Sequence, residues 1–189
     1  MKNLHTFIII LLTISTIQSQ EVTNSAPLDV KLSSSVSVNG TSTLHDWESI
    51  VELTNAKMTL KSLDERSIET LEVKIEATSI KSGKKLMDKL TYEALKAKEH
   101  PLITFIFKKG EIVSDTTKVL TLKLQGDLTI AGVTKNVAVL TTINKLENQT
   151  TLQGEYKLKM TDYGIKPPKA LLGTIKTGDE ITIKFNLNF

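Results

Sequence analysis

The sequence predicts an all-β protein: an extended antiparallel barrel of about eight strands with one amphipathic helix. Residues 120–130 (LTLKLQGDLTI) alternate apolar residues or glycine with polar ones, which places the two sets on opposite faces of a strand. Similar alternation recurs along the chain, and one segment, 83–98, follows helical spacing instead. A two-sheet sandwich is the alternative, because alternation alone does not establish closure.

The first 20 residues have the pattern of a secretory signal peptide. Lys2 precedes the apolar run 7–12 (FIIILL), and a short uncharged segment follows it. The run is shorter than the about 20 residues that a membrane span requires. We therefore expect 1–20 to be removed near Ser19 or Gln20 and 21–189 to form one domain; an uncleaved anchor is the alternative.

The remaining elements follow from the same patterns. In segment 51–60 the apolar residues change from odd to even positions, which predicts a bulge or bend near Thr54–Asn55. Residues 131–135 (AGVTK) predict a hairpin turn, and His100-Pro101 ends the helix. Alternation predicts the other strands at residues 30–39, 71–77, 103–107, 120–130, 136–143, 156–160 and 181–189.

Composition excludes several function classes. The net charge is +3 and Arg66 is the single arginine, so we expect no nucleic-acid partner. The chain contains no cysteine, which excludes disulfides, thiolate chemistry and a lipid-modified cysteine. With the signal peptide, this predicts a periplasmic or secreted protein without stable membrane insertion. A homodimer is compatible with the pattern.

Catalytic residues are scarce. After the signal peptide only His45 and His100 remain, and no nucleophile elbow or metal-ligand spacing occurs. Neighbouring strand residues such as His45 and Asp46 point to opposite faces, so a role at a turn or at the barrel mouth is favoured over acid–base or metal chemistry. We expect no enzyme, no catalytic residue, no metal site and no cofactor.

The apolar inward-facing residues are the candidate binding surface. Trp47, the single tryptophan, is either an ordinary core anchor or a ring at a cavity mouth. Gly126 lies on the inward face of the longest predicted strand, where it permits bending or leaves internal space. The predicted cavity lining is Trp47, Leu71, Val73, Ile75, Leu86, Met87, Leu90, Phe105, Leu122, Leu124, Gly126, Leu128, Leu158 and Phe185.

Several segments together resemble the YceI-like polyisoprenoid-binding proteins. They are 40–48 (GTSTLHDWE), 87–107 (MDKLTYEALKAKEHPLITFIF), 126–135 (GDLTIAGVTK) and 160–165 (MTDYGI), and 166–189 is similar to exported members from the Bacteroidetes group. The resemblance implies a lipocalin-like, extended eight-stranded antiparallel barrel. It also implies non-catalytic binding of a polyisoprenoid, an isoprenoid quinone or a similar long-chain amphiphile.

The residues that correspond to the family pattern are mainly architectural. They match its Pro-x-Ile-Thr-Phe strand start, its long hairpin and its Asp-aromatic-Gly turn: Pro101, Ile103, Thr104, Phe105, Gly126, Asp127, Leu128, Gly132, Thr134, Lys135, Asp162, Tyr163 and Gly164. The family's His-x-His-Leu segment before the helix has no counterpart, since 84–88 is KKLMD. We therefore expect a periplasmic carrier or sequestering protein for such a lipid. The alternatives are a solid-cored stress-related or interaction module without a ligand, and an enzyme acting on a lipid-like substrate.

Overall fold

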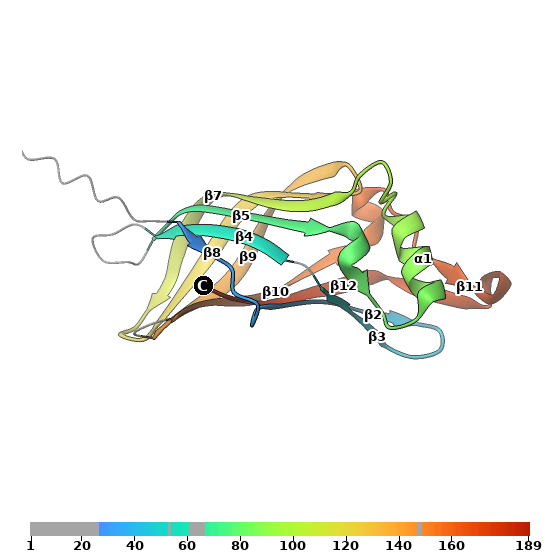
Figure 1. Ribbon diagram of the computed structural model, residues 1–189, viewed down its shortest axis with the longest axis horizontal. Helices are drawn as coiled ribbons and strands as arrows, with labels where there is room; N and C mark the ends of the chain where they lie inside the picture. Colours follow the sequence, from blue (N-terminus) through green and yellow to red (C-terminus); the bar gives the residue numbers. More distant parts are fainter. Residues whose placement is uncertain (1–26, 53, 61–66, 147–148) are drawn as a thin grey trace, which may run out of the picture.

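The chain forms an elongated, nearly closed antiparallel barrel, and α1, the one α-helix of its described residues, lies at one end (Figure 1). The computed structural model describes residues 27–52, 54–60, 67–146 and 149–189. The predicted signal peptide, 1–20, lies outside the described residues. The first described residues and the C-terminus lie toward the end of the barrel away from α1.

The strands account for most of the described chain. They are β1 (Leu28–Asp29), β2 (Ser35–Ser42), β3 (Trp47–Val51), β4 (Thr54–Leu60), β5 (Ile68–Glu76), β6 (Ile80–Lys81), β7 (Leu102–Asp115), β8 (Val119–Ile130), β9 (Val133–Leu146), β10 (Gln149–Lys159), β11 (Lys169–Ala170) and β12 (Ile175–Asn188). The helical elements are η1 (Ala77–Ser79), α1 (Lys85–Ala94), η2 (Met160–Tyr163) and η3 (Leu171–Gly173).

One hydrogen-bonded sheet runs in the order β1-β4-β5-β7-β8-β9-β10-β12-β2-β3-β6, and β11 pairs with β12. The chain crosses the seam between the two ends of this path twice, because β3 continues into β4 and β5 continues through η1 into β6. The Glu52 N–H donates to the Ser79 carbonyl oxygen at 2.9 Å, which joins the two crossings. The architecture is therefore a barrel, and the sandwich alternative was wrong.

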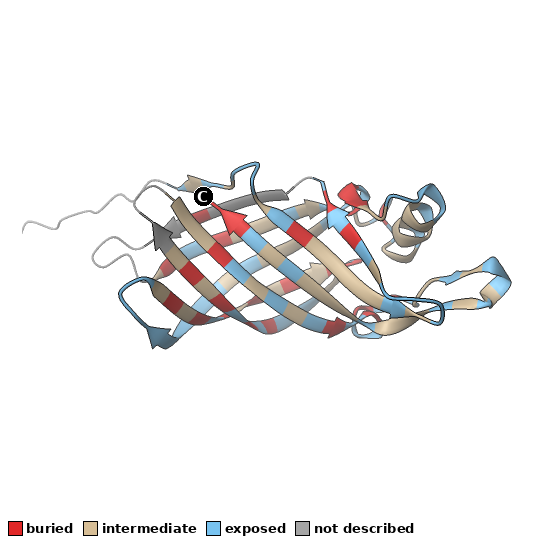
Figure 2. Cartoon of the chain, turned by 90° about the horizontal axis from the view of Figure 1, so that it is seen from below, coloured by how far each residue is buried: buried red, intermediate tan, exposed pale blue. Residues whose placement is uncertain are grey.

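Strand β8 shows why the sequence forms this sheet. Its apolar residues and Gly126 are buried from Leu120 to Ile130, while the residues between them are half-buried or exposed. Figure 2 shows the same banding across the barrel wall. The turn to β9 needs only Ala131 and Gly132, both with positive φ (48° and 80°), a geometry typical of a two-residue hairpin.

Three expectations need correction. Nine strands of five or more residues occur in the described part, one more than expected, because segment 47–60 is two strands. The phase change at 51–56 falls where β3 ends at Val51 and β4 begins at Thr54 on the other side of the seam, one or two residues before the position predicted for a bulge or bend. Helix α1 ends at Ala94 rather than near residue 98, because Lys96 adopts φ 52° in the following turn.

The interior is filled unevenly along the barrel. At the end away from α1, five leucine and isoleucine side chains of one core cluster are each only 2% exposed: Leu122, Leu124, Ile143, Leu152 and Leu187. We call this the packed end. No residue of α1 is buried, although the helix covers the opposite opening.

Candidate binding cavity

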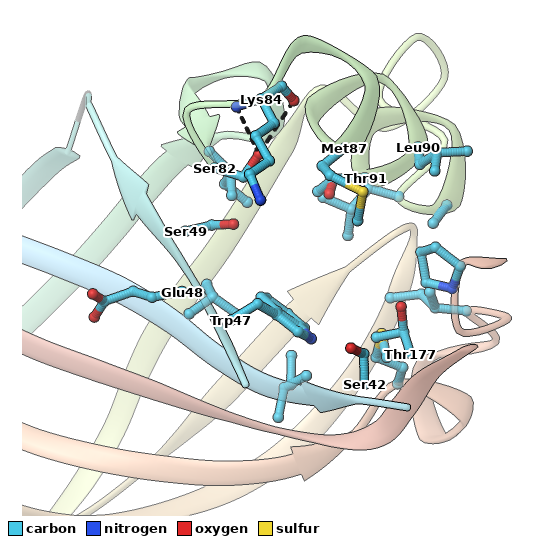
Figure 3. A pocket seen from close by; sticks show the side chains of 18 of the residues that line it. Ser42, Trp47, Glu48, Ser49, Ser82, Lys84, Met87, Leu90, Thr91 and Thr177 are labelled. Carbon is cyan, nitrogen blue, oxygen red and sulfur yellow. Dashed lines mark hydrogen bonds between the residues drawn. The ribbon is translucent and has the colours of Figure 1, made fainter. Parts of the chain in front are cut away.

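A cavity of about 480 Å³ lies under α1, inside the helix end of the barrel (Figure 3). Its wall comes from α1 and from inward-facing residues of seven of the long strands. Most of the lining is apolar: Val36, Val38, Leu44, Trp47, Val51, Ile75, Ile80, Met87, Leu90, Ala94, Leu95, Ile103, Ile130, Leu158, Met160, Ile165, Pro168, Ala170, Ile175, Ile181 and Ile183. The volume falls within the range of about 300–1,000 Å³ usual for ligand pockets.

Polar contacts on one flank of α1 hold the helix over this opening. Asp88 accepts hydrogen bonds from the Ser82 N–H (2.7 Å) and the Ser82 hydroxyl (2.6 Å). These bonds hold the pKa of the Asp88 carboxyl below its usual value. One turn later, the Tyr92 hydroxyl accepts from Lys81 Nζ (2.8 Å) and lies 2.9 Å from the Thr78 carbonyl oxygen.

The apolar face of α1 is thereby turned toward the cavity. In Figure 3, Met87 and Thr91 extend from the helix toward Trp47, on the opposite side of the cavity. Met87 and Leu90 are half-buried. Because these side chains border empty space rather than a partner surface, the helix covers the barrel without filling it.

Trp47 is fixed at the edge of the cavity. Its indole N–H donates to the Thr41 carbonyl oxygen at 2.9 Å. The ring lies across Gly40 of β2, where an added Cβ would come within 2.7 Å of the indole Cε2. The side chain is half-buried and forms part of the lining, so the structure places it as a ring at the cavity rather than as a core anchor.

The rim is polar but electrically balanced. Its charged residues are Asp46, Glu48, Lys84 and Lys169, two of each sign. Ser42, Ser82, Thr91 and Thr177 add hydroxyl groups. This rim offers hydrogen bonds to a head group without a strong charge preference.

His45 lies in the exposed loop between β2 and β3. Its Nδ1 lies 2.6 Å from the carbonyl oxygen of Asp46, and the Ser42 hydroxyl donates to the His45 carbonyl oxygen at 2.8 Å. Among the described residues, no group of three or more His, Cys, Asp or Glu side chains could hold a metal ion. The contacts of His45 therefore organise the loop at the rim.

The cavity stops midway along the barrel. Ile75, Ile103 and Ile183 are the deepest lining residues of β5, β7 and β12. On each of these strands the next residue of the same face, two positions farther from α1, does not border the cavity. These residues are Val73, Phe105 and Phe185. Beyond them is the packed end.

The structure brings five of the predicted lining residues together at the cavity: Trp47, Ile75, Met87, Leu90 and Leu158. The other predicted residues do not border it: Leu71, Val73, Leu86, Phe105, Leu122, Leu124, Gly126, Leu128 and Phe185. Leu86 is 58% exposed on the outer side of α1, Leu122 and Leu124 belong to the packed end, and the Phe105 ring covers Gly126.

Sequence reasoning missed most of the actual wall. Ile103, Ile130, Ile181 and Ile183 carried the same alternation signal as the residues chosen, and Ile130 lies in the strand pattern analysed first. The signal existed, but it does not distinguish positions along the barrel axis. The rim residue Lys84 precedes the helix and belongs to no strand pattern.

The comparisons with known proteins agree with this architecture. The model of the YceI-like domain matches residues 28–189. No helix in the described part of the chain has the length and apolarity to cross a membrane. No curated protein matches the chain.

Solved structures with the same fold include BcnA of Burkholderia cenocepacia, with a TM-score of 0.74 and 21% identity over 85% of this chain and 99% of that one. A polyisoprenoid binding domain from Saccharophagus degradans, implicated in plant cell wall breakdown, has a TM-score of 0.67 and 10% identity, with 85% and 95% coverage. The YCEI protein of Campylobacter jejuni gives 0.59 and 20%, with 97% and 90% coverage. These similarities are to the fold.

Proposed function

Because this chain belongs to the YceI-like family, we propose that it binds a polyisoprenoid or a similar long-chain amphiphile in the cavity under α1. It carries or sequesters this lipid without chemical conversion. The observation that carries the proposal is a largely apolar cavity of about 480 Å³ with a polar, charge-balanced rim.

The two parts of the cavity match the two parts of an amphiphile. The isoleucine and valine wall provides a surface for a hydrocarbon tail, and the hydroxyl groups of Ser42 and Thr177 lie at the rim for a head group. A polyisoprenoid binding domain among the proteins of similar fold supports a ligand of this kind.

Apolar contact alone is sufficient for retention. Each isoprene unit of about five carbons contributes a gross ~4 kcal/mol when buried, at about 0.8 kcal/mol per CH₂ group. Ordering the tail and bringing it out of its membrane or micelle offset a large part of this sum. No charged anchor is required, in agreement with the cancelling charges of the rim.

The compartment and the assembly belong to the same proposal. The pattern of residues 1–20 supports export, and the absence of cysteine suits a periplasmic or secreted domain that is stabilised by its core alone. We propose the periplasm as the site of action, and we retain a homodimer as a prediction.

The direct test is to purify the mature protein from its own cells without detergent, extract it with organic solvent and identify the extract by mass spectrometry. We expect one class of isoprenoid lipid in near-stoichiometric amount. If no lipid is recovered, and the delipidated protein also fails to take up prenols and isoprenoid quinones, the proposal is wrong.

A pair of variants on α1 localises the binding. Leu90→Lys places a charge over the cavity and should lower the recovered lipid at least tenfold. Leu86→Lys introduces the same charge on the same helix, but at a side chain that is 58% exposed and outside the cavity. It should retain the lipid as the unmodified protein does, and equal losses in both variants would place the ligand elsewhere.

A further inference from the structure

The layer of side chains directly below the cavity contains two phenylalanine rings. Phe105 follows Ile103 on β7, and Phe185 follows Ile183 on β12, each one inward position deeper than the last lining residue of its strand. Both rings pack against the core clusters on either side of them. They therefore lie between the empty and the filled parts of the barrel.

Each ring is seated on a glycine of the neighbouring strand. A Cβ added at Gly126 would lie 2.5 Å from Cζ of Phe105, and one added at Gly154 would lie 2.7 Å from Cζ of Phe185. The two glycines thus provide the room that the rings occupy inside a narrow barrel. The rings are half-buried, so neighbouring side chains do not enclose them completely.

Below the rings lies the packed end. The leucine and isoleucine side chains of the packed end are each 2% exposed. A chain that passed the rings would have to displace this core, at the cost of the contacts made there.

The volume of the cavity above the rings limits the length of isoprenoid tail that can be buried. A cavity of about 480 Å³ lies in the lower part of the range of about 300–1,000 Å³ usual for ligand pockets. This is enough for a short prenyl tail of about three isoprene units, but not for a tail of eight. Further units of a longer tail would remain at the rim, in contact with water.

We propose that Phe105 and Phe185 form a floor that limits the buried tail to about three isoprene units, so that they determine which chain length this protein prefers. This inference rests on the proposed function and adds a length limit to it. The preferred ligand is a single-tailed isoprenoid of about 15 carbons, and a longer tail gains nothing from its additional units.

The test measures affinity against tail length. Trp47 is the single tryptophan and lines the cavity, so its fluorescence reports occupancy by geraniol, farnesol, geranylgeraniol and octaprenol, which carry two, three, four and eight isoprene units. For the delipidated mature protein we expect the affinity to rise at least tenfold from geraniol to farnesol. From farnesol to octaprenol it should change less than twofold.

Substitutions of Phe105 and Phe185 should change the tail length at which the affinity stops rising. Phe105→Ala and Phe185→Ala should raise the preference for geranylgeraniol over farnesol at least fivefold, and the double variant should raise it further. Ile106→Ala is the matched control, because Ile106 neighbours Phe105 on β7 but its side chain is 44% exposed outside the barrel. If an alanine variant fails to fold, Phe105→Leu and Phe185→Leu test the same shift with less lost packing.

The outcomes separate the two proposals. An affinity that rises steadily through octaprenol in the unmodified protein would overturn the floor and leave lipid binding intact. Unchanged length preference in folded floor variants would also overturn it. Failure of all four prenols to bind the unmodified protein would overturn both.

Discussion

Gly126 shows how little room the middle of the barrel leaves for an additional atom. A Cβ at this position would lie 2.6 Å from the Ile106 carbonyl oxygen, and the Phe105 ring lies equally close. The sequence suggested that this glycine permits bending or leaves internal space, and the structure shows that an aromatic ring occupies the space beside it. A residue can be assigned to the inner face from its pattern, but what covers it depends on the neighbouring strand.

We therefore expect Gly126→Ala to lower the free energy of unfolding by about 1–3 kcal/mol, the usual effect of overpacking. Gly110→Ala is the matched control, since its added Cβ would have its nearest neighbours at 3.6 Å, an ordinary contact distance. It should change stability by less than about 1 kcal/mol. Urea unfolding of both variants measures the difference, and similar values for the two would contradict the close packing at Gly126.

The burial of Tyr163 predicts that the folded protein loses stability at alkaline pH. Its side chain is 2% exposed, and its hydroxyl has no hydrogen-bond partner among the described residues. Burial raises its pKa to about 12, above the value of about 10 of an unfolded chain. The unfolded state therefore loses this proton first, so the stability that Tyr163 contributes is present below pH 10 and is lost as the pH rises toward 12.

The variant Tyr163→Phe should remove this part of the pH dependence. Below pH 10 its stability should equal or slightly exceed that of the unmodified protein, because no hydrogen bond is lost with the hydroxyl. Urea unfolding at pH 8 and pH 11 provides the comparison. A variant that loses as much stability as the unmodified protein between these values would show that another group is responsible.

Helix α1 is the element whose attachment controls access to the cavity. Ser82 and Lys81 hold it through Asp88 and Tyr92, and none of its residues is buried. Periodicity predicted the helix and its apolar stripe, but it gave Leu86 and Leu90 equal weight. Only the polar contacts on one flank decide that Leu90 faces the cavity and Leu86 faces solvent, and such contacts have no periodic signal.

The Asp88 attachment should make lipid release dependent on pH. Hydrogen bonds from Ser82 lower the pKa of Asp88, so the attachment is complete above the ordinary aspartate value of about 4 and is lost as the pH falls through the lowered value. We expect Trp47 fluorescence to show faster prenol release below pH 4. Asp88→Asn should release the prenol several-fold faster already at pH 7.

Asp179→Asn is the control for this experiment. The pKa of Asp179 is also lowered, by hydrogen bonds from Thr161, but Asp179 lies on β12 and does not border the cavity. Its release rate at pH 7 should match that of the unmodified protein. Equal acceleration in the two variants would indicate a general loss of structure rather than movement of α1.

At the scale of the whole molecule, side chains fill the half of the barrel away from α1, and the half under α1 encloses the cavity. Alternation predicted the wall of the barrel well, because one-sided burial imposes period 2 on every strand. It could not predict where the wall encloses space, since Leu122 at the packed end and Ile130 at the cavity have the same pattern and the same burial class. Strand register across the sheet and the position of α1 decide that difference, and neither is local in sequence.

Hydrogen exchange should reveal these halves. On binding farnesol, amides of α1 and of residues 175–183 should gain protection, because they surround the cavity. Amides of residues 119–124 should not change, since this part of β8 lies at the packed end. Exchange measured by mass spectrometry at peptide level is sufficient, and added protection confined to 119–124 would contradict this placement.

The chain crosses the seam of the barrel twice, from β3 to β4 and from β5 to β6, and this affects how the sheet can pair with other protein chains. The strands at the two ends of the hydrogen-bonded path, β1 and β6, are each two residues long. Unpaired backbone along a long outer strand is what recruits further chains into β-aggregates. In the described part of this sheet, the backbone left open to a further chain is limited to the parts of β4 and β3 that the short strands β1 and β6 do not cover, so only short segments could serve as a template for such growth.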